Sequence, residues 1–152
     1  MTDIIIKSNV DNIKQALIGG VLRKAASAGG EVVRNYAKLN VRSTFSAKSK
    51  GGAGLAGSII VSVVKSDNTL CTVDIGPTKV YGRIQELGGV ITPVYAKMLS
   101  WVGDDGVRRF ANSVRLPPRP YMRPAMDNHK DDIIKAVGYQ IEKGIRDSLE
   151  KL

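Results

Sequence analysis

The residue types that most often carry chemistry are scarce in this sequence. His129 is the single histidine, Cys71 is the single cysteine, and Asp104-Asp105 is a pair of adjacent carboxylates in a predicted turn. An enzyme site needs a reactive group and a second group that tunes it. His129 lies among aspartates in the first turns of a predicted helix, which favours a solvated or capping role over that of a general base or ligand. Aspartate is common in turns because it bonds to nearby backbone groups, so the Asp104-Asp105 pair indicates a turn.

Metal and phosphate chemistry are equally poorly supported. One cysteine excludes an internal disulfide and a cysteine-based metal cage, and Cys71 is expected as a small buried residue on a strand. The glycine-rich segment GGAGLAG lacks the Lys-Ser/Thr ending of a phosphate-binding loop and precedes a predicted strand. We therefore expect a protein that is not an enzyme, with no catalytic residue, no cofactor and no metal site.

The charge distribution points to an acidic partner. The chain has a formal net charge of +9 and a pI near 9.8. Residues 121–152 are neutral, and the excess lies upstream, above all in a run that no acid interrupts: Arg34, Lys38, Arg42, Lys48 and Lys50. Such a field favours nucleic acid or a negatively charged protein surface. A basic nucleic-acid-binding module stays an alternative, although no helix-turn-helix, zinc-finger or aromatic RNA-binding signature accompanies the bases.

Two long amphipathic helices are predicted at the two ends of the chain. Apolar residues recur at steps of three or four from Ile6 to Leu39 and again from Met126 to Leu152. The first helix contains Gly19-Gly20 and Gly29-Gly30, each glycine costing about 1 kcal/mol relative to alanine. Either this helix bends at the glycines, or another backbone packs closely against it.

Two hairpins are predicted between these helices. Residues 59–75 alternate around a Ser-Asp-Asn turn, and β-prone segments flank the sequence GDDG at residues 103–106. Residues 40–54 and 78–93 are expected as mobile loops that order on a neighbour or partner. The predicted fold is α+β, with two long helices packed on an antiparallel sheet of about four strands, in a single domain of residues 1–152. No window approaches a membrane span, so we expect a soluble, unexported protein with no membrane contact.

Prolines mark the segment VRLPPRPYMRPAMD as a rigid joint between the last strand and the last helix. Pro117 and Pro118 cannot donate to a sheet and so end the strand, whereas Pro120 or Pro124 fits the first turn of a helix. Tyr121 and Met122 are expected to pack inward. If the segment winds helically, its three arginines at steps of four present one basic edge: Arg115, Arg119 and Arg123.

Three segments in order resemble a known family. GAGLAGSIIVSV, VDIGPTKVYGRIQELGG and LPPRPYMRPAMD are similar to motifs of phage tail-completion proteins, the tail components that include the minor tail protein Z type and the Mu-like virion morphogenesis proteins. The matching positions are Glu86, Arg119, Pro120, Arg123, Pro124 and Ala125. Ala53, Ala56 and Gly57 depart from the Thr and Arg that the first motif often carries.

The resemblance implies a structural virion protein that is made in the host cytoplasm. Such proteins form rings, commonly hexameric, at the head-proximal end of the tail, where they complete the tail and join it to the head. The implied partners are further copies of the chain, a tail-tube or tail-terminator protein and head-connector proteins, with transient contact with DNA in the channel. A ring subunit needs a heterologous interface, in which one face fits a different face of its neighbour.

The residues expected at this interface are charged and lie in the basic run, the segment 78–93 and the joint: Arg42, Lys48, Lys50, Arg83, Glu86, Arg115, Arg119 and Arg123. A carboxylate accepts a two-pronged bond from arginine. Glu86 is therefore hypothesised to pair with Arg119 or Arg123, within a subunit or across the ring. The alternative is a solvated carboxylate in a turn.

Overall fold

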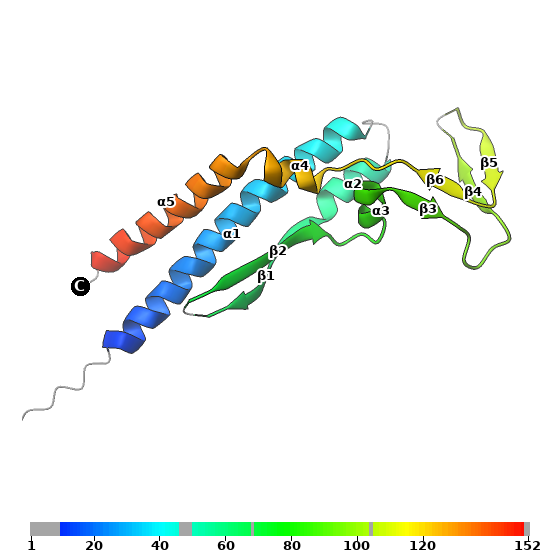
Figure 1. Ribbon diagram of the computed structural model, residues 1–152. Helices are drawn as coiled ribbons and strands as arrows, with labels where there is room; N and C mark the ends of the chain where they lie inside the picture. The colour runs from blue at the N-terminus through cyan, green and yellow to red at the C-terminus, as the bar shows by residue number, and fades with distance from the viewer. Residues whose placement is uncertain (1–9, 46–49, 68, 104, 151–152) are drawn as a thin grey trace, which may run out of the picture.

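A long helix forms the spine of the molecule. The computed structural model describes residues 10–45, 50–67, 69–103 and 105–150. Helix α1 (Val10–Thr44) spans 35 residues, and the last helix, α5 (Lys130–Leu149), runs antiparallel along it. Figure 1 shows that the beginning of α1 and the end of α5 lie at the same end of the molecule.

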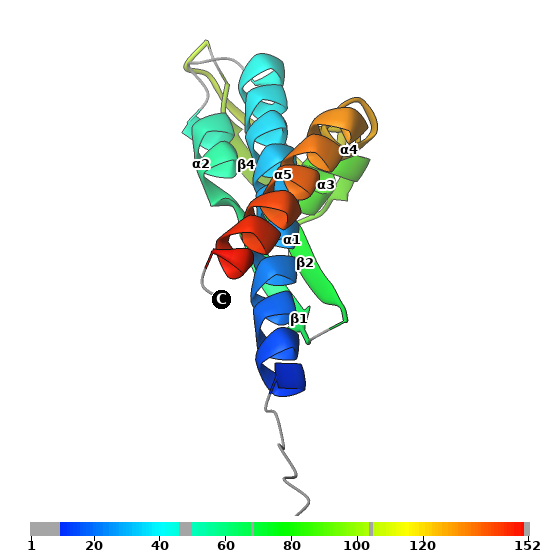
Figure 2. The same ribbon diagram turned by 90° about the vertical axis from the view of Figure 1, so that its left-hand side faces the viewer.

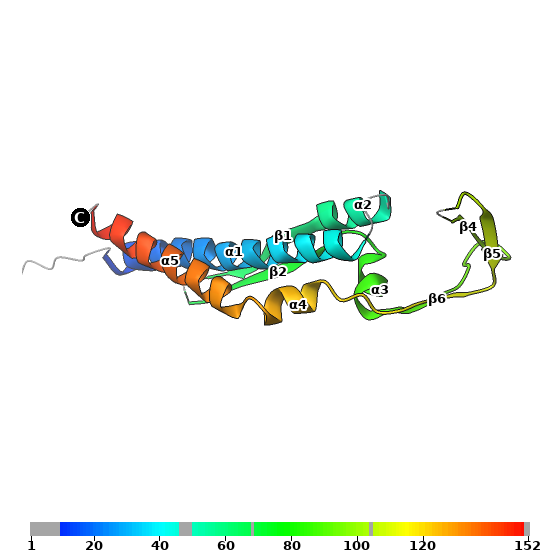
Figure 3. The ribbon, with the colours of Figure 1, turned by 90° about the horizontal axis from the view of Figure 1, so that it is seen from above.

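The spine lies between two layers. On one side α1 packs against the hairpin of β1 (Ile59–Ser66) and β2 (Cys71–Pro77), and on the other side against α5. Figures 2 and 3 show the hairpin and α5 on different sides of α1. Two adjacent glycines explain the close approach. A methyl group on Gly29 would lie 2.8 Å from Val137 of α5, and one on Gly30 would lie 2.8 Å from Val61 of β1.

The first hairpin was predicted correctly. Its strands are antiparallel, with Ile59 opposite Pro77 and Ser66 opposite Cys71, and the register shifts between Val63 and Lys65. At the turn, one carboxylate oxygen of Asp67 accepts hydrogen bonds from the backbone N–H groups of Thr69 and Leu70 at 2.8 and 2.7 Å. These local bonds hold the pKa of Asp67 down to about 2. Cys71 is half-buried at the first position of β2.

The core lies at the carboxyl half of α1. Here α1 meets the short helix α2 (Lys50–Ser58), the start of β1 and helix α4 (Met122–Asp127). The buried cluster consists mainly of aliphatic side chains with one tyrosine: Val33, Ala37, Val41, Leu55, Ala56, Ile59, Tyr121 and Ala125. The small residues let α1, α2 and α4 approach closely.

A two-part arm projects from this body. After β2, the chain forms helix α3 (Gly82–Leu87) and strand β3 (Gly89–Ile91), then the hairpin of β4 (Leu99–Val102) and β5 (Arg108–Ala111), and returns along β6 (Val114–Leu116). Strand β3 pairs with β6, and β4 pairs with β5. We call residues 89–116 the arm. Figures 1 and 3 show that it extends away from the helices, with β4 and β5 at its far end.

The α+β class, the two terminal helices and the second hairpin are therefore confirmed, but the sheet and the layering differ from the prediction. Within the described ranges, the strands form three separate two-stranded sheets instead of one sheet of about four strands. Since α3 and the turn at Gly88 separate β2 from β3, the later strands run away from the β1–β2 edge. Of the two long helices, α1 packs on the β1–β2 sheet, whereas α5 covers the opposite side of α1.

The two predicted loops are also largely structured. Residues 40–44 continue α1 and residues 50–54 begin α2, while the segment 78–93 contains α3 and β3. The polar, glycine-rich composition of residues 40–54 suggested a loop, but burial of Leu55 and Ala56 against α1 outweighs the poor helix propensity of glycine. The last helix is broken into α4 and α5 at Asn128 and His129.

In the described residues, no helix is both long enough and apolar enough to cross a membrane.

Candidate assembly interface

The joint between the arm and the body is built around one carboxylate. Glu86, on α3, accepts hydrogen bonds from three consecutive backbone N–H groups, those of Tyr121, Met122 and Arg123, at 2.7, 2.9 and 3.0 Å. These groups form the amino end of α4, where backbone donors lack partners within the helix. The carboxylate also sits at the positive end of the helix dipole. Glu86 therefore caps α4 from another element.

Further hydrogen bonds hold the returning chain to the body. The backbone N–H of Arg119 donates to the carbonyl of Gln85 at 2.8 Å. The hydroxyl of Tyr121 donates to the carbonyl of Gly82 at 3.2 Å, and the side-chain amide of Asn40 donates to the carbonyl of Tyr121 at 3.0 Å. These bonds connect α1, α3 and the start of α4, so this segment is held against the body, while its rigidity stays a prediction.

Tyr121 is the buried centre of this joint. Its side chain is 1% exposed, and Met122 packs beside it, as expected from the sequence. Burial, and secondarily the charge of Glu86, raise the pKa of Tyr121 to about 12. The hydroxyl therefore stays protonated and remains a donor to Gly82 under ordinary conditions. Pro124 lies in the first turn of α4, where its missing N–H has no consequence.

Gly88 sets the direction in which the arm leaves α3. Its φ of +69° lies in the left-handed region that favours glycine. A methyl group at this position would also lie 2.7 Å from the backbone nitrogen of Pro118 and 2.9 Å from the carbonyl oxygen of Leu116. The outgoing and returning chains of the arm therefore touch at a position that only glycine fits.

The expected pairing of Glu86 with an arginine side chain is wrong within one subunit. Among the described residues, Glu86 forms no ion pair with Arg119 or Arg123, because its oxygens are directed at the backbone of α4. Arg119 instead lies over the ring of Phe45, with its guanidinium carbon 5.5 Å from the ring centre. Pairing across a ring is not tested by a single chain.

The predicted basic edge is not formed. Arg115 lies on β6, Arg119 lies in the extended chain after the two prolines, and Arg123 lies in α4, so the segment does not wind as one helix. Prolines 117 and 118 disfavour the helical conformation for the residues before them, which explains the extended path.

The other expected interface residues are spread over the body. Arg42 is exposed in the last turn of α1, and Arg83 is exposed on α3. Lys50 is the first residue of α2, and Lys48 lies outside the described residues. The structure therefore brings Glu86 together with the backbone of Tyr121, Met122 and Arg123, while the place of the eight residues in an interface stays a prediction.

Two shallow depressions flank the joint. One, of about 430 Å³, lies on the body and is lined in part by Pro77, Val80, Leu87 and Met122. The other, of about 580 Å³, lies at the base of the arm beside Val90 and Pro118. Both are open and lined by apolar side chains together with a few charged ones, features of protein contact surfaces.

One side-chain cluster between α1 and α5 was not foreseen. The hydroxyl of Tyr36 donates to Asp132 at 2.9 Å, the rings of Tyr36 and His129 stack with centres 3.3 Å apart, and His129 Nδ1 lies 3.5 Å from Asp132. The hydrogen bond from Tyr36 lowers the pKa of Asp132 and raises that of Tyr36. Tyr36 is 96 residues away from Asp132, so no local pattern indicated this contact.

Of the two adjacent aspartates considered for chemistry, Asp105 takes part in local hydrogen bonds of a turn. Asp105 accepts a hydrogen bond from the backbone of Val107 and two from the guanidinium of Arg109, at 2.6 and 3.0 Å. These bonds lower the pKa of Asp105 and order the turn of the second hairpin, while Asp104 lies outside the described residues. No group of three or more His, Cys, Asp or Glu side chains in the described part of the chain is placed to hold a metal ion.

The exposed apolar side chains were also missed, and they concentrate on the arm. Of the nineteen large hydrophobic residues that are exposed in the described structure, eight lie between residues 90 and 110: Val90, Val94, Tyr95, Met98, Trp101, Val102, Val107 and Phe110. The β-prone pattern predicted a hairpin there. It could not show that this hairpin stays uncovered by the other described elements of the chain.

Comparison with known families identifies one match. Residues 6–88, more than half of the chain, match the family model described as "Bacteriophage HK97-gp10, putative tail-component". The matched region contains α1 to α3 and ends where the arm begins. No curated protein and no solved structure matches the chain. The resemblance to phage tail components is thus confirmed, while assignment to the protein Z or Mu-like type stays a prediction.

Proposed function

The chain belongs to the HK97-gp10-like family of phage tail components, and we propose that this structural tail protein forms a ring at the head-proximal end of the tail. In this role it completes the tail and joins it to the head. Its partners are further copies of itself, a tail-tube or tail-terminator protein and head-connector proteins. It acts by binding these proteins, not by catalysis.

The uncovered arm is the observation that supports assembly most directly. A two-stranded hairpin is marginally stable in water by itself, and large exposed apolar patches mark protein contact sites. Here the hairpin β4–β5 carries exposed Trp101, Val102 and Phe110 at the end of a projection from the body. At the base of this projection, the hydrogen bonds from the amino end of α4 to Glu86 tie the returning chain to the body.

The mass of the recombinant protein in solution tests this function. We expect a ring-sized species, visible by electron microscopy, either alone or after addition of the tail-tube partner. Tails assembled without the protein should fail to join filled heads, and the added protein should restore joining. A chain that is monomeric under all conditions and never enters tails would overturn the proposal.

A nucleic-acid-binding module is the second candidate, because the chain carries a net charge of +9. Phosphate attraction weakens steeply with salt, so binding only at low salt indicates an unspecific field. A specific complex with duplex DNA at about 0.15 M salt, where the Debye length is about 8 Å, would favour this candidate.

A further inference from the structure

The two depressions beside the joint share one apolar side chain. Leu87 lines both of them, with Val80 in the depression on the body and Val90 in the one at the base of the arm. Val80 is 96% exposed, and Leu87 and Val90 are each 57% exposed. We call the lining of the two depressions the joint surface. Exposed apolar side chains that gather around a depression are typical of a protein contact site.

The joint surface is also basic. Lys79, Arg83 and Arg115 line it and are exposed, and none of them forms an ion pair within the described chain. Glu86 is the only acid among the described lining residues, and its carboxylate accepts hydrogen bonds from three backbone N–H groups. The surface therefore presents three cations against one carboxylate that is already engaged.

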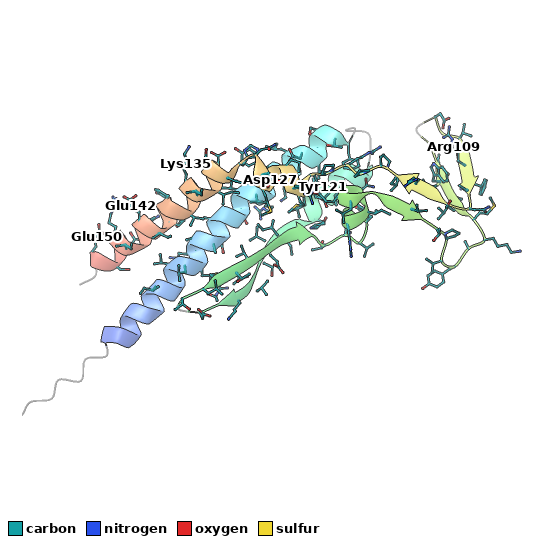
Figure 4. All side chains as sticks on the ribbon, in the orientation of Figure 1. Arg109, Tyr121, Asp127, Lys135, Glu142 and Glu150 are labelled. Atoms are coloured by element: carbon teal, nitrogen blue, oxygen red, sulfur yellow. The ribbon has the colours of Figure 1, made fainter. Side chains whose placement is uncertain are left out.

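The surrounding chain does not neutralise this charge. Residues 77–123 contain eight Lys or Arg and three Asp or Glu. One of these acids is Glu86, and another, Asp105, is paired with Arg109 at the far end of the arm. Figure 4 shows Glu142 on α5, well away from Tyr121 at the joint. The carboxylates that complement the joint surface must therefore come from another molecule.

The apolar part of the lining favours a protein over nucleic acid. Cations suffice to attract phosphate groups, and unpaired bases stack on exposed aromatic rings. The joint surface instead places aliphatic side chains beside its cations, and its one aromatic residue, Tyr121, is buried. Such a surface is complementary to a protein segment that combines apolar residues with Asp or Glu.

A second copy of this chain does not supply such a segment. The exposed acids of α4 and α5 each have a Lys or Arg four positions away, on the same side of the helix. The acids concerned are Asp127, Asp131, Glu142, Asp147 and Glu150.

The remaining exposed acids of the described chain lie on strands and turns. Asp67 and Asp105 are paired with Lys65 and Arg109. Asp74, on the outward side of the β1–β2 hairpin, is a single carboxylate and cannot match three cations. The occupant of the joint surface should therefore be a different protein.

We propose that the joint surface binds an acidic, apolar segment of another virion protein. Carboxylates of this segment contact Lys79, Arg83 and Arg115, and its apolar side chains cover Leu87. The inference rests on the proposed function, because a tail component that completes the tail must bind other tail or head proteins. It adds the place of one such contact and the chemistry of the partner.

A photo-cross-linking amino acid in place of Val80 identifies the occupant. Val80 is 96% exposed, so this substitution should leave the fold intact. In irradiated tails, the cross-linked peptide should come from another virion protein and contain more Asp and Glu than Lys and Arg. The same amino acid in place of Lys143, an exposed residue of α5, is the control and should not cross-link to that peptide.

Charge reversal measures the contribution of the cations. Arg83→Glu and Arg115→Glu should each raise the protein concentration needed for half-maximal incorporation into tails about tenfold or more. Arg83→Gln removes the charge without reversing it and should have a smaller effect. Lys143→Glu is the matched control and should be incorporated like the native chain. Urea midpoints should be the same for all four variants, because the replaced side chains are exposed.

A compensating change tests the pairing directly. Once the cross-linked segment is known, replacing its acids with Arg one at a time should identify one that restores the incorporation of Arg83→Glu. The same replacement should weaken incorporation of the native chain, because like charges then face each other.

The outcomes separate this inference from the proposed function. A cross-link to a second copy, to DNA or to a segment without an excess of acids would overturn the inference. Tails that contain the protein but give no cross-link, or that incorporate the charge-reversed variants normally, would overturn it as well. All of these results leave the role in the tail intact, whereas a chain that never enters tails would overturn both.

Discussion

At the scale of single residues, Glu86 was predicted to bind the Arg119–Arg123 segment, but the groups of that segment that it binds differ from the prediction. Nearby arginines suggested an ion pair, but the carboxylate binds three backbone N–H groups of α4. Every residue except proline carries the same backbone N–H group, whatever its side chain. The sequence therefore cannot show which helix end a distant carboxylate will cap. That prediction needs the path of the chain through the joint.

Replacing Glu86 should destabilise the fold. Glu86→Ala leaves the donors at the amino end of α4 without their partner, and we expect a loss of about 2 kcal/mol in the free energy of unfolding. Glu86→Gln keeps an acceptor oxygen and should lose less. Urea denaturation measures both changes.

Three variants serve as controls for the cap. Glu142→Ala breaks only an exposed ion pair with Arg146, so it should change stability by less than about 0.5 kcal/mol. If Arg119→Ala or Arg123→Ala cost as much as Glu86→Ala, a side-chain ion pair would explain Glu86 better than the cap does.

The contact between Tyr36 and Asp132 should make stability depend on pH. The hydrogen bond from Tyr36 lowers the pKa of Asp132 below the usual 3.8. A lowered carboxyl pKa in the folded state adds stability above the usual value, and this contribution is lost as the pH falls through the folded value. Tyr36→Phe should therefore be less stable than the native chain at pH 7.

The difference in stability between the native chain and Tyr36→Phe should narrow below about pH 4, as the carboxyl group of Asp132 becomes protonated. Urea midpoints at pH 7 and pH 3 measure this change, and the exposed Tyr139→Phe serves as the control because its hydroxyl group is not part of the contact. An equal difference at both pH values would show that the Tyr36 hydroxyl does not act through the charge of Asp132.

At the scale of elements, the two glycine pairs of α1 illustrate what periodicity can and cannot predict. The apolar period predicted the helix, and glycine in its interior predicted either a bend or a close contact. The structure selects the contact at Gly29-Gly30, where side chains of α5 and of the β1–β2 hairpin approach. A glycine of α1 is needed where another element packs closely against it and is merely tolerated where none does. The helix sequence alone does not distinguish these two cases.

Alanine at two glycines of α1 should therefore have opposite effects. At Gly20 an added methyl group meets nothing within 4 Å, so Gly20→Ala should raise stability by up to about 1 kcal/mol through helix propensity alone. At Gly29 the methyl group would be 2.8 Å from Val137, and overpacking should outweigh that gain, giving a net loss of about 1 kcal/mol. Thermal unfolding of both variants measures these changes in stability. If Gly29→Ala were stabilising, α5 would have to shift freely on α1.

The elements that were predicted have local sequence signals, whereas those that were missed depend on packing against distant parts of the chain. Long periodic helices and hairpins around turn residues have local signals, and all of them were found. Helices α2 and α3 are short and contain or follow glycine, and α2 depends on burying Leu55 and Ala56 against a helix that is distant along the sequence. Their formation follows from tertiary packing, which a single sequence does not display.

At the scale of the whole molecule, the arm contributes nothing to the core that the structure describes. None of the buried hydrophobic residues of the described chain lies between residues 91 and 114. The cap by Glu86 and the buried Tyr121 lie outside the arm, so the body should keep its fold when most of the arm is removed. We expect the arm to serve contact with other molecules rather than stability.

Removing the arm tests this division of roles. Replacing residues 91–114 with Asn-Gly joins Val90 to Arg115, which are already paired, through a two-residue hairpin turn. The shortened chain should retain its helical circular dichroism and unfold in one transition with a urea midpoint close to that of the full chain. Because the cap is distant from the excision, Glu86→Ala should cost the same in both chains, within about 0.5 kcal/mol. A shortened chain that lacks cooperative unfolding would show that the arm is part of the folding unit, whereas a stable body that no longer assembles assigns the arm to the contacts between subunits.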